Sequence, residues 1–158
     1  MLFLQFQLGA VRYAVEARRV VEVIPLVNIQ PLADAPPGVA GLFNYRGRPV
    51  PALDLARLTQ GRPSEERLST RILVVQCQGG AGTARLLGLI AEQAVKLLHK
   101  DSREFLPSGV NVRSAPYLGP VATDGHGVIQ WIHEQQLLPE GTRDLVFGQT
   151  GERAHGAD

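Results

Sequence analysis

Glycine and proline interrupt every apolar segment of this chain, and their spacing limits the folds that it can adopt. Seventeen glycines and eleven prolines are spread through 158 residues, and the sequence contains no long helical pattern. The intervening segments are short and rich in branched and aromatic side chains, as strands are. Many short strands cut by glycine or proline turns are typical of small antiparallel barrels. We therefore expect a mainly β fold with short helices.

The expected elements can be placed along the chain from these patterns. Strands are expected over residues 3–8, 11–15, 20–24, 70–77, 85–91, 117–122 and 128–132, with a strand or short helix over 94–99. Helical turns are expected after residue 16 and over residues 133–138. Asp54 is expected to cap a helix over residues 55–60 that Gly61 ends. Gly88 inside an apolar strand predicts a bulge or a sharp bend. No repeat with matching residues is visible, although the length allows two barrel-like halves.

Composition argues against several classes of protein. The net charge is only +1, from 16 basic and 15 acidic residues, whereas a nucleic-acid binder usually carries a clear basic excess. The single Cys77 excludes an intramolecular disulfide, makes a thiolate metal cluster improbable and favours a reducing compartment. No apolar run approaches the ~20 residues of a membrane-spanning helix, and residues 1–4 are too short for a signal peptide. We expect residues 1–146 to form the folded domain and the polar, Gly-rich residues 147–158 to form a flexible tail.

Catalytic and cofactor motifs are not evident. The serines do not lie in a Gly-x-Ser-x-Gly turn, and the four histidines are scattered. His133-Glu134 lacks the second histidine of a zinc protease motif, and residues 79–82 favour a hairpin turn over a phosphate-binding loop because a strand follows them. No catalytic residue, metal or cofactor is therefore predicted. A small hydrolase with an unrecognised Ser/His pair is the less favoured alternative.

Two surface segments are candidates for recognition. In residues 41–55, two apolar segments flank Arg46-Gly47-Arg48, and arginine is enriched in binding hot spots. The simpler interpretation is a solvated Arg46 beside a carboxylate such as Glu22. In residues 20–24, either all the apolar side chains are core, or Val20 or a neighbour is exposed beside Glu22.

Several spaced motifs together resemble the CheW-like coupling proteins of bacterial chemosensory arrays, over roughly residues 3–139. The matching residues in the first half are Phe6-x-Leu8-Gly9, Tyr13-x-Val15, Val20-x-Glu22-Val23 and Asn44-x-Arg46-Gly47-x-x-x-Pro51-x-x-Asp54-Leu55. Those in the second half are Gly88-Leu89-Ile90 followed by Glu92 and Val95, Tyr117-Leu118-x-x-Val121 and Glu134-x-x-x-Leu138. The resemblance implies two small five-stranded SH3-like barrels packed side by side.

The resemblance also implies a function. Such a protein is not an enzyme and needs no cofactor. It bridges the cytoplasmic tip of a chemoreceptor to the regulatory domain of a CheA-type histidine kinase, and other CheW-like domains are further partners. It would be cytoplasmic, associated with membrane receptor arrays that control swimming or surface sensing, and would neither bind nucleic acid nor insert into the membrane.

The family pattern implies receptor-binding positions as well. Val20, Glu22 and Arg46 would lie on or near the receptor-binding groove, and Asn44 and Gly47 would shape the hairpin. Two residues depart from the pattern: Tyr45 replaces a leucine common in this motif, and Glu16 replaces a better helix cap. Tyr45 would either alter receptor choice or bury its ring against the lobe. A generic SH3-like peptide binder is the other alternative, and it would require clustered exposed aromatic side chains.

Overall fold

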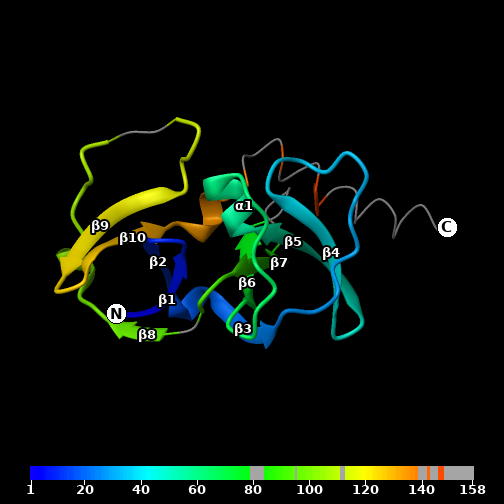
Figure 1. Cartoon of the computed structure of the whole chain (residues 1–158), viewed down its shortest axis with the longest axis horizontal. Helices are drawn as coiled ribbons and strands as arrows, with labels where there is room; N and C mark the ends of the chain where they lie inside the picture. The colour runs from blue at the N-terminus through cyan, green and yellow to red at the C-terminus, as the bar shows by residue number, and fades with distance from the viewer. Residues whose placement is uncertain (79–83, 95, 111–112, 139–141, 143–145, 148–158) are drawn as a thin grey trace.

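The computed structural model describes residues 1–78, 84–94, 96–110, 113–138, 142 and 146–147, and within them two five-stranded sheets form two lobes side by side (Figure 1). The first sheet has the order β8 (Lys96–His99), β1 (Leu2–Leu8), β2 (Val11–Glu16), β10 (Gly127–Ile132) and β9 (Leu118–Asp124). The second has the order β3 (Val20–Pro25), β6 (Arg71–Gln78), β7 (Ala84–Ala91), β5 (Arg48–Asp54) and β4 (Val39–Tyr45). The helices are short: α1 (Leu55–Gln60) and the 3-10 turns η1 (Ala17–Arg19), η3 (Ser102–Glu104) and η4 (Glu134–Gln136). The predicted mainly β fold is confirmed.

The two sheets share one topology but are assembled differently along the chain. Each has a central antiparallel hairpin, β1–β2 or β6–β7, whose second strand pairs in parallel with β10 or β5. The second lobe uses consecutive strands, β3 to β7. The first lobe combines the N-terminal β1 and β2 with the returning β8, β9 and β10, so its sheet is complete only after the chain has passed through the second lobe. No repeat of matching residues accompanies this shared topology.

Three hydrophobic clusters form among the residues that the structure describes. One lies inside the first lobe around Phe3 and Trp131, and one inside the second lobe around Phe43. The third and largest is shared by both lobes. Strand β6 shows how the sequence serves two of them: Ile72 and Val74 belong to the second lobe's own cluster, while the alternate residues Leu73 and Val75 belong to the shared one. A strand buried on both faces is apolar at successive positions, which explains its continuous Ile-Leu-Val-Val run.

Local signals predicted helix α1 correctly, but they predicted a bulge at Gly88 that the structure does not have. The side chain of Asp54 accepts hydrogen bonds from the backbone N–H groups of Ala56 (3.1 Å) and Arg57 (3.4 Å), and Gly61 ends the helix with a left-handed φ of 72°. Of the bulge or sharp bend expected at Gly88, the bulge is wrong, because β6 and β7 pair without a register shift. Glycine is needed there because a Cβ would lie 2.4 Å from the ring of Phe43.

Two further expectations concern the helical turns and the chain end. The turn after Glu16 is only the three-residue η1, and Glu16 makes no side-chain cap hydrogen bond. The tail was expected to begin at Phe147, but the Phe147 side chain is 3% exposed and packs into the shared cluster, so this boundary is too early. Residues 148–158, like the predicted turn at 79–82 and Val95, lie outside the described residues. Among the described helices, none has the length and apolar character needed to cross a membrane.

Candidate functional site: the Arg46 hairpin beside strand β3

A tight turn presents Arg46 at the tip of the β4–β5 hairpin. Tyr45 pairs with Arg48, which leaves Arg46 and Gly47 as a two-residue loop with φ values of 52° and 83°. Positive φ at both positions is the geometry of a type I′ turn, whose twist matches that of the flanking strands. The Asn44 side-chain oxygen accepts a hydrogen bond from the Gly47 N–H at 2.7 Å. Asn44 and Gly47 therefore shape the turn that carries Arg46, as the family pattern implied.

Glu22 on β3 joins the hairpin through two hydrogen bonds. Its Oε1 atom accepts one from the Tyr45 hydroxyl at 2.6 Å and one from an Arg46 guanidinium nitrogen at 2.8 Å. The Arg46 side chain is 73% exposed, while Tyr45 is 7% exposed and packs edge-on to Phe43. The Tyr45 ring is thus buried against the lobe, and its hydroxyl is an additional donor to Glu22. We call Glu22, Tyr45 and Arg46 the Glu22 cluster.

Electrostatics favour a charged Glu22 carboxyl and a neutral Tyr45 hydroxyl near neutral pH. The hydrogen bond from Tyr45 lowers the pKa of the Glu22 carboxyl, partial desolvation opposes this, and the charge of Arg46 lowers the pKa further. The same hydrogen bond, together with desolvation, raises the pKa of the Tyr45 hydroxyl. Glu22 is therefore an acceptor and Tyr45 a donor, and the two interactions do not compete.

A bulge in β3 decides which valine faces solvent. Val20 pairs with Val75 and Glu22 pairs with Val74, so Val21 is the extra residue between them. Val21 is 51% exposed, whereas Val20 is half-buried and packs against the shared cluster. The structure thus brings together Glu22, Asn44, Arg46 and Gly47, and places Val21 rather than Val20 on the open surface. Strict alternation along residues 20–24 gives no sign of the bulge.

The surface around this hairpin is hollowed. One hollow is lined by Val21, Tyr45, Arg46, Arg48, Gln76, Arg85 and Leu86. Its lining comes from β3, the β4–β5 hairpin, β6 and β7 of the second lobe. The hollow combines apolar side chains with guanidinium groups and with Gln76, a composition suited to contact with another protein.

The sequence model of the CheW-like domain family matches residues 2–141. The chain belongs to this family. It is 27% identical over 138 residues to Protein FrzA of Myxococcus xanthus, covering 86% of this chain and 78% of that protein. Among solved structures, it matches the scaffolding protein TtCheW from Thermoanaerobacter tengcongensis with a TM-score of 0.75 and 22% identity, covering 87% of each chain. The resemblance and the two SH3-like barrels are therefore confirmed, and the CheW-like family is one of scaffold and adaptor proteins in chemosensory signalling.

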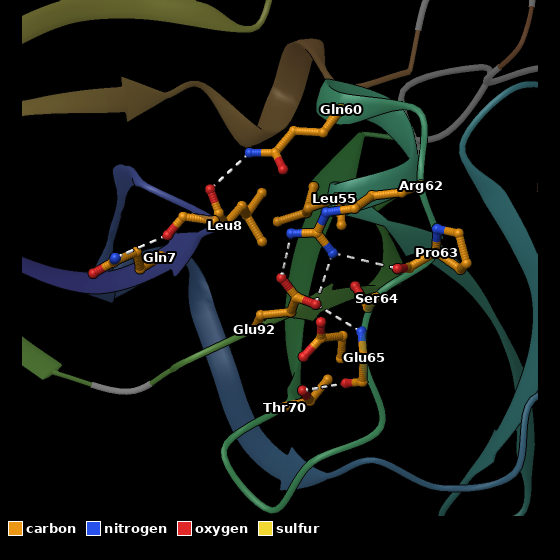
Figure 2. Close-up of polar contacts among 12 residues, drawn as sticks. Gln7, Leu8, Leu55, Gln60, Arg62, Pro63, Ser64, Glu65, Thr70 and Glu92 are labelled. Carbon is orange, nitrogen blue, oxygen red and sulfur yellow. Dashed lines mark hydrogen bonds and ion pairs between the residues drawn. The ribbon is translucent and has the colours of Figure 1, made fainter.

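A second polar cluster of this CheW-like domain lies near the junction of the lobes, and Figure 2 shows the Glu92 carboxylate at its centre with Arg62 and the Glu65 backbone. The Glu92 carboxylate accepts hydrogen bonds from the Arg62 guanidinium at 2.8 and 3.0 Å and from the Glu65 N–H at 2.6 Å. Its backbone carbonyl accepts one from the Gln7 N–H of the first lobe at 3.2 Å. Nearby, the Gln60 side chain donates to the Leu8 carbonyl at 2.7 Å. Arg62, Glu65 and Glu92 are named below as the Glu92 cluster.

The Glu92 cluster is a feature that sequence reasoning missed. Glu92 was singled out only through the family pattern, and Arg62 and Glu65 lie in a polar loop without a distinctive motif. The hydrogen bonds from Arg62 lower the pKa of the Glu92 carboxyl, burial opposes this, and the Glu65 N–H lowers it further. The cluster holds the loop after α1 against the end of β7 at the lobe junction, which is a structural task.

The environment of the aromatic residues bears on the SH3-like alternative. Every Phe, Tyr and Trp of the chain lies in the described part, and each is at most 8% exposed. Tyr13 and Tyr117 belong to the shared cluster, and Tyr45 belongs to the second lobe's own cluster. An aromatic peptide groove of the SH3 type therefore has no exposed aromatic side chains from which it could be built.

The described serines show no arrangement that favours catalysis. The Ser64 hydroxyl donates to the buried Asp54 carboxylate at 2.5 Å, and the Ser108 hydroxyl donates to the Val110 carbonyl at 3.1 Å. Within the same residues, no group of three or more His, Cys, Asp or Glu side chains is placed to hold a metal ion. The polar groups at the candidate site can bind and orient a partner by hydrogen bonding and charge.

Proposed function

We propose that this CheW-like domain is a non-catalytic adaptor that couples chemoreceptors to a CheA-type histidine kinase. The receptor's cytoplasmic tip and the kinase's regulatory domain are its partners, other CheW-like domains are a third, and the setting is a cytoplasmic array beneath membrane receptors. The observation that carries the proposal is the Glu22 cluster at a type I′ turn of a CheW-like double barrel, with exposed Val21 beside it.

The shared core supports a scaffold role. Both lobes contribute side chains to one cluster, so surfaces on different lobes are held at a defined separation. A receptor tip is a helical bundle, and a helix presents apolar side chains flanked by polar ones to a groove. Single interfaces below roughly 1,200 Å² are weak, but many of them in an array raise the effective concentration of each partner. The domain thus fixes the relative position of its binding surfaces, and the many contacts of the array strengthen the overall binding.

Replacing Arg46 tests the receptor-binding part of the proposal. Arg46→Ala is expected to weaken binding to a receptor-tip fragment roughly thirtyfold, the effect of losing a hot spot worth about 2 kcal/mol. The circular dichroism spectrum should not change, because the side chain is mostly in water. Isothermal titration calorimetry measures the affinity, with Arg113→Ala, an exposed residue of the first lobe's loop, as the matched control. Wild-type affinity in Arg46→Ala would remove Arg46 from the site.

The kinase part of the proposal needs its own measurement. The wild-type domain should co-purify with the regulatory domain of a CheA-type kinase in the absence of receptor. Arg46→Ala should leave this interaction unchanged, because two partners bridged at once must occupy different surfaces. Loss of both interactions in this variant would indicate a general defect and contradict a separate receptor surface.

A further inference from the structure

Three arginines surround the hollow beside the Glu22 cluster. Arg46, Arg48 and Arg85 lie at this hollow together with the apolar side chains of Val21 and Leu86. Val21 is 51% exposed and Leu86 is half-buried, so both present apolar surface at the hollow. We call it the arginine hollow. The whole chain has a net charge of only +1, so this positive charge is a local feature and not a property of the entire surface.

Two of the three arginines lack an acidic partner among the residues that the structure describes. Glu22 accepts hydrogen bonds from Tyr45 and Arg46, so its charge is matched to Arg46. Arg48 and Arg85 are exposed, and neither forms an ion pair within the part of the chain that the structure describes. Six other arginines form such pairs with carboxylates, namely Arg12, Arg18, Arg19, Arg62, Arg67 and Arg103, while Arg57, Arg71 and Arg113 form none within the described residues. What distinguishes Arg48 and Arg85 is that they lie together at one hollow with apolar side chains. Among the described residues, two guanidinium groups beside an apolar surface therefore have no carboxylate partner, so they can pair with a carboxylate of another protein.

We propose that the arginine hollow binds an acidic segment of the receptor-tip helix, whose Asp or Glu pairs with Arg48 and Arg85 while an apolar side chain of the helix packs on Val21 and Leu86. The inference rests on the proposed adaptor function and adds the charge of the partner segment. Residues three or four apart lie on the same face of a helix, so one apolar and one acidic residue can reach both parts of the hollow. Guanidinium groups bind carboxylates through paired, charge-assisted hydrogen bonds, which makes the match directional.

Charge reversal on both sides of the interface tests this assignment. The probe is a dimeric coiled-coil fragment of a chemoreceptor tip, in its natural form and in a form whose exposed acidic residues are replaced by lysine. Arg48→Glu and Arg85→Glu should each weaken binding of the natural fragment about tenfold, and the double variant about a hundredfold. Arg113→Glu makes the same change in net charge on the first lobe and should bind as the wild type does. The lysine fragment should bind the double variant more tightly than it binds the wild type, which a merely structural role would not produce.

Each other outcome overturns the inference in a distinguishable way. Wild-type affinity in both arginine variants would refute the arginine hollow and leave the adaptor function intact. Equal losses in Arg113→Glu would show a dependence on net charge alone. A wild-type domain that binds no receptor fragment would refute the adaptor function as well. Binding to phosphatidylglycerol vesicles that is lost in the double variant, with receptor binding retained, would assign the hollow to lipid.

Discussion

Glu22 and Glu92 each bind an arginine through charge-assisted hydrogen bonds, but water reaches them to very different extents. The side chains of Glu22 and Arg46 are 35% and 73% exposed, and those of Glu92 and Arg62 are 8% and 37% exposed. Exposed ion pairs add little to stability because water screens them and both side chains lose freedom. Breaking a buried pair is costly because it leaves a desolvated charge without a partner. The same interaction is therefore exposed and open to a partner in the Glu22 cluster, and largely buried and structural in the Glu92 cluster.

The two clusters also differ in what they connect. The Glu22 cluster joins strand β3 to a hairpin of the same lobe, and its arginine projects from the molecule. The Glu92 cluster lies where the lobes meet: the Gln7 N–H donates to the Glu92 carbonyl, and the Gln60 side chain donates to the Leu8 carbonyl, the second of which is drawn in Figure 2. A substitution in the Glu22 cluster should change the affinity for a binding partner. A substitution in the Glu92 cluster should change the free energy of unfolding.

The largest expected effect on stability is that of Glu92→Gln. The amide lacks the negative charge that pairs with Arg62, and it offers one acceptor oxygen in place of the two that Arg62 and the Glu65 N–H use. We therefore expect the free energy of unfolding to fall by about 2 kcal/mol. Glu22→Gln, the matched control, should leave the midpoint of urea unfolding nearly unchanged while weakening receptor binding. Equal shifts in both midpoints would contradict the distinction between the clusters.

Two adjacent valines in β3, one packed on the core and one exposed, allow the same comparison between a structural and a surface position. Val20→Glu places a charge against the shared cluster and should lower the free energy of unfolding by at least ~1 kcal/mol. Val21→Glu adds the same charge at the exposed bulge and should leave the unfolding midpoint within a few tenths of a kcal/mol of wild type. Its effect should appear in receptor affinity instead. Chemical denaturation and titration with the receptor-tip fragment separate the two results, and a cooperative wild-type-like transition in Val20→Glu would argue against its burial.

The smallest expected effect is on the pH dependence of stability. Both carboxyl groups have folded-state pKa values below the ordinary value of 4.5, so the folded protein favours their charged forms. Their stabilisation is complete above that value and is lost as the pH falls through the lower folded-state pKa values. Urea midpoints measured from neutral pH down to acid pH should therefore decline more gently in Glu92→Gln than in wild type. Glu22→Gln should change this slope less, and the reverse order would contradict the assignment of the buried cluster.

Local chemistry explains which parts of the fold were predictable. Asp54 and Gly61 stand within one helix length of each other, and the interactions that begin and end α1 involve only neighbouring residues. The strands followed from short apolar runs between glycines and prolines. Gly88 and Phe147 were misjudged because their environments are set by distant side chains, the Phe43 ring in one case and the shared cluster in the other.

In the candidate site, too, the features set by neighbouring residues were predictable and those set by distant residues were not. The Asn44-x-Arg46-Gly47 motif identified the hairpin, and Glu22 was considered as a neighbour of Arg46 from the sequence. The exposed valine and the Glu92 cluster were not identified, because a bulge and a contact across 30 residues of chain leave no local pattern. Tyr45 was recognised as a departure from the family pattern, but its hydroxyl bond to Glu22 required the structure.

From its amino acids alone, this chain determined its short strands, its capped helix α1, its turn residues and its family, since these depend on backbone preferences and on spacing within a few residues. Tertiary structure decided which arginine meets which glutamate, which valine is exposed and how one core serves two lobes. Those outcomes depend on strand register and on the burial of side chains that lie far apart along the chain, and they exist only once both sheets are formed.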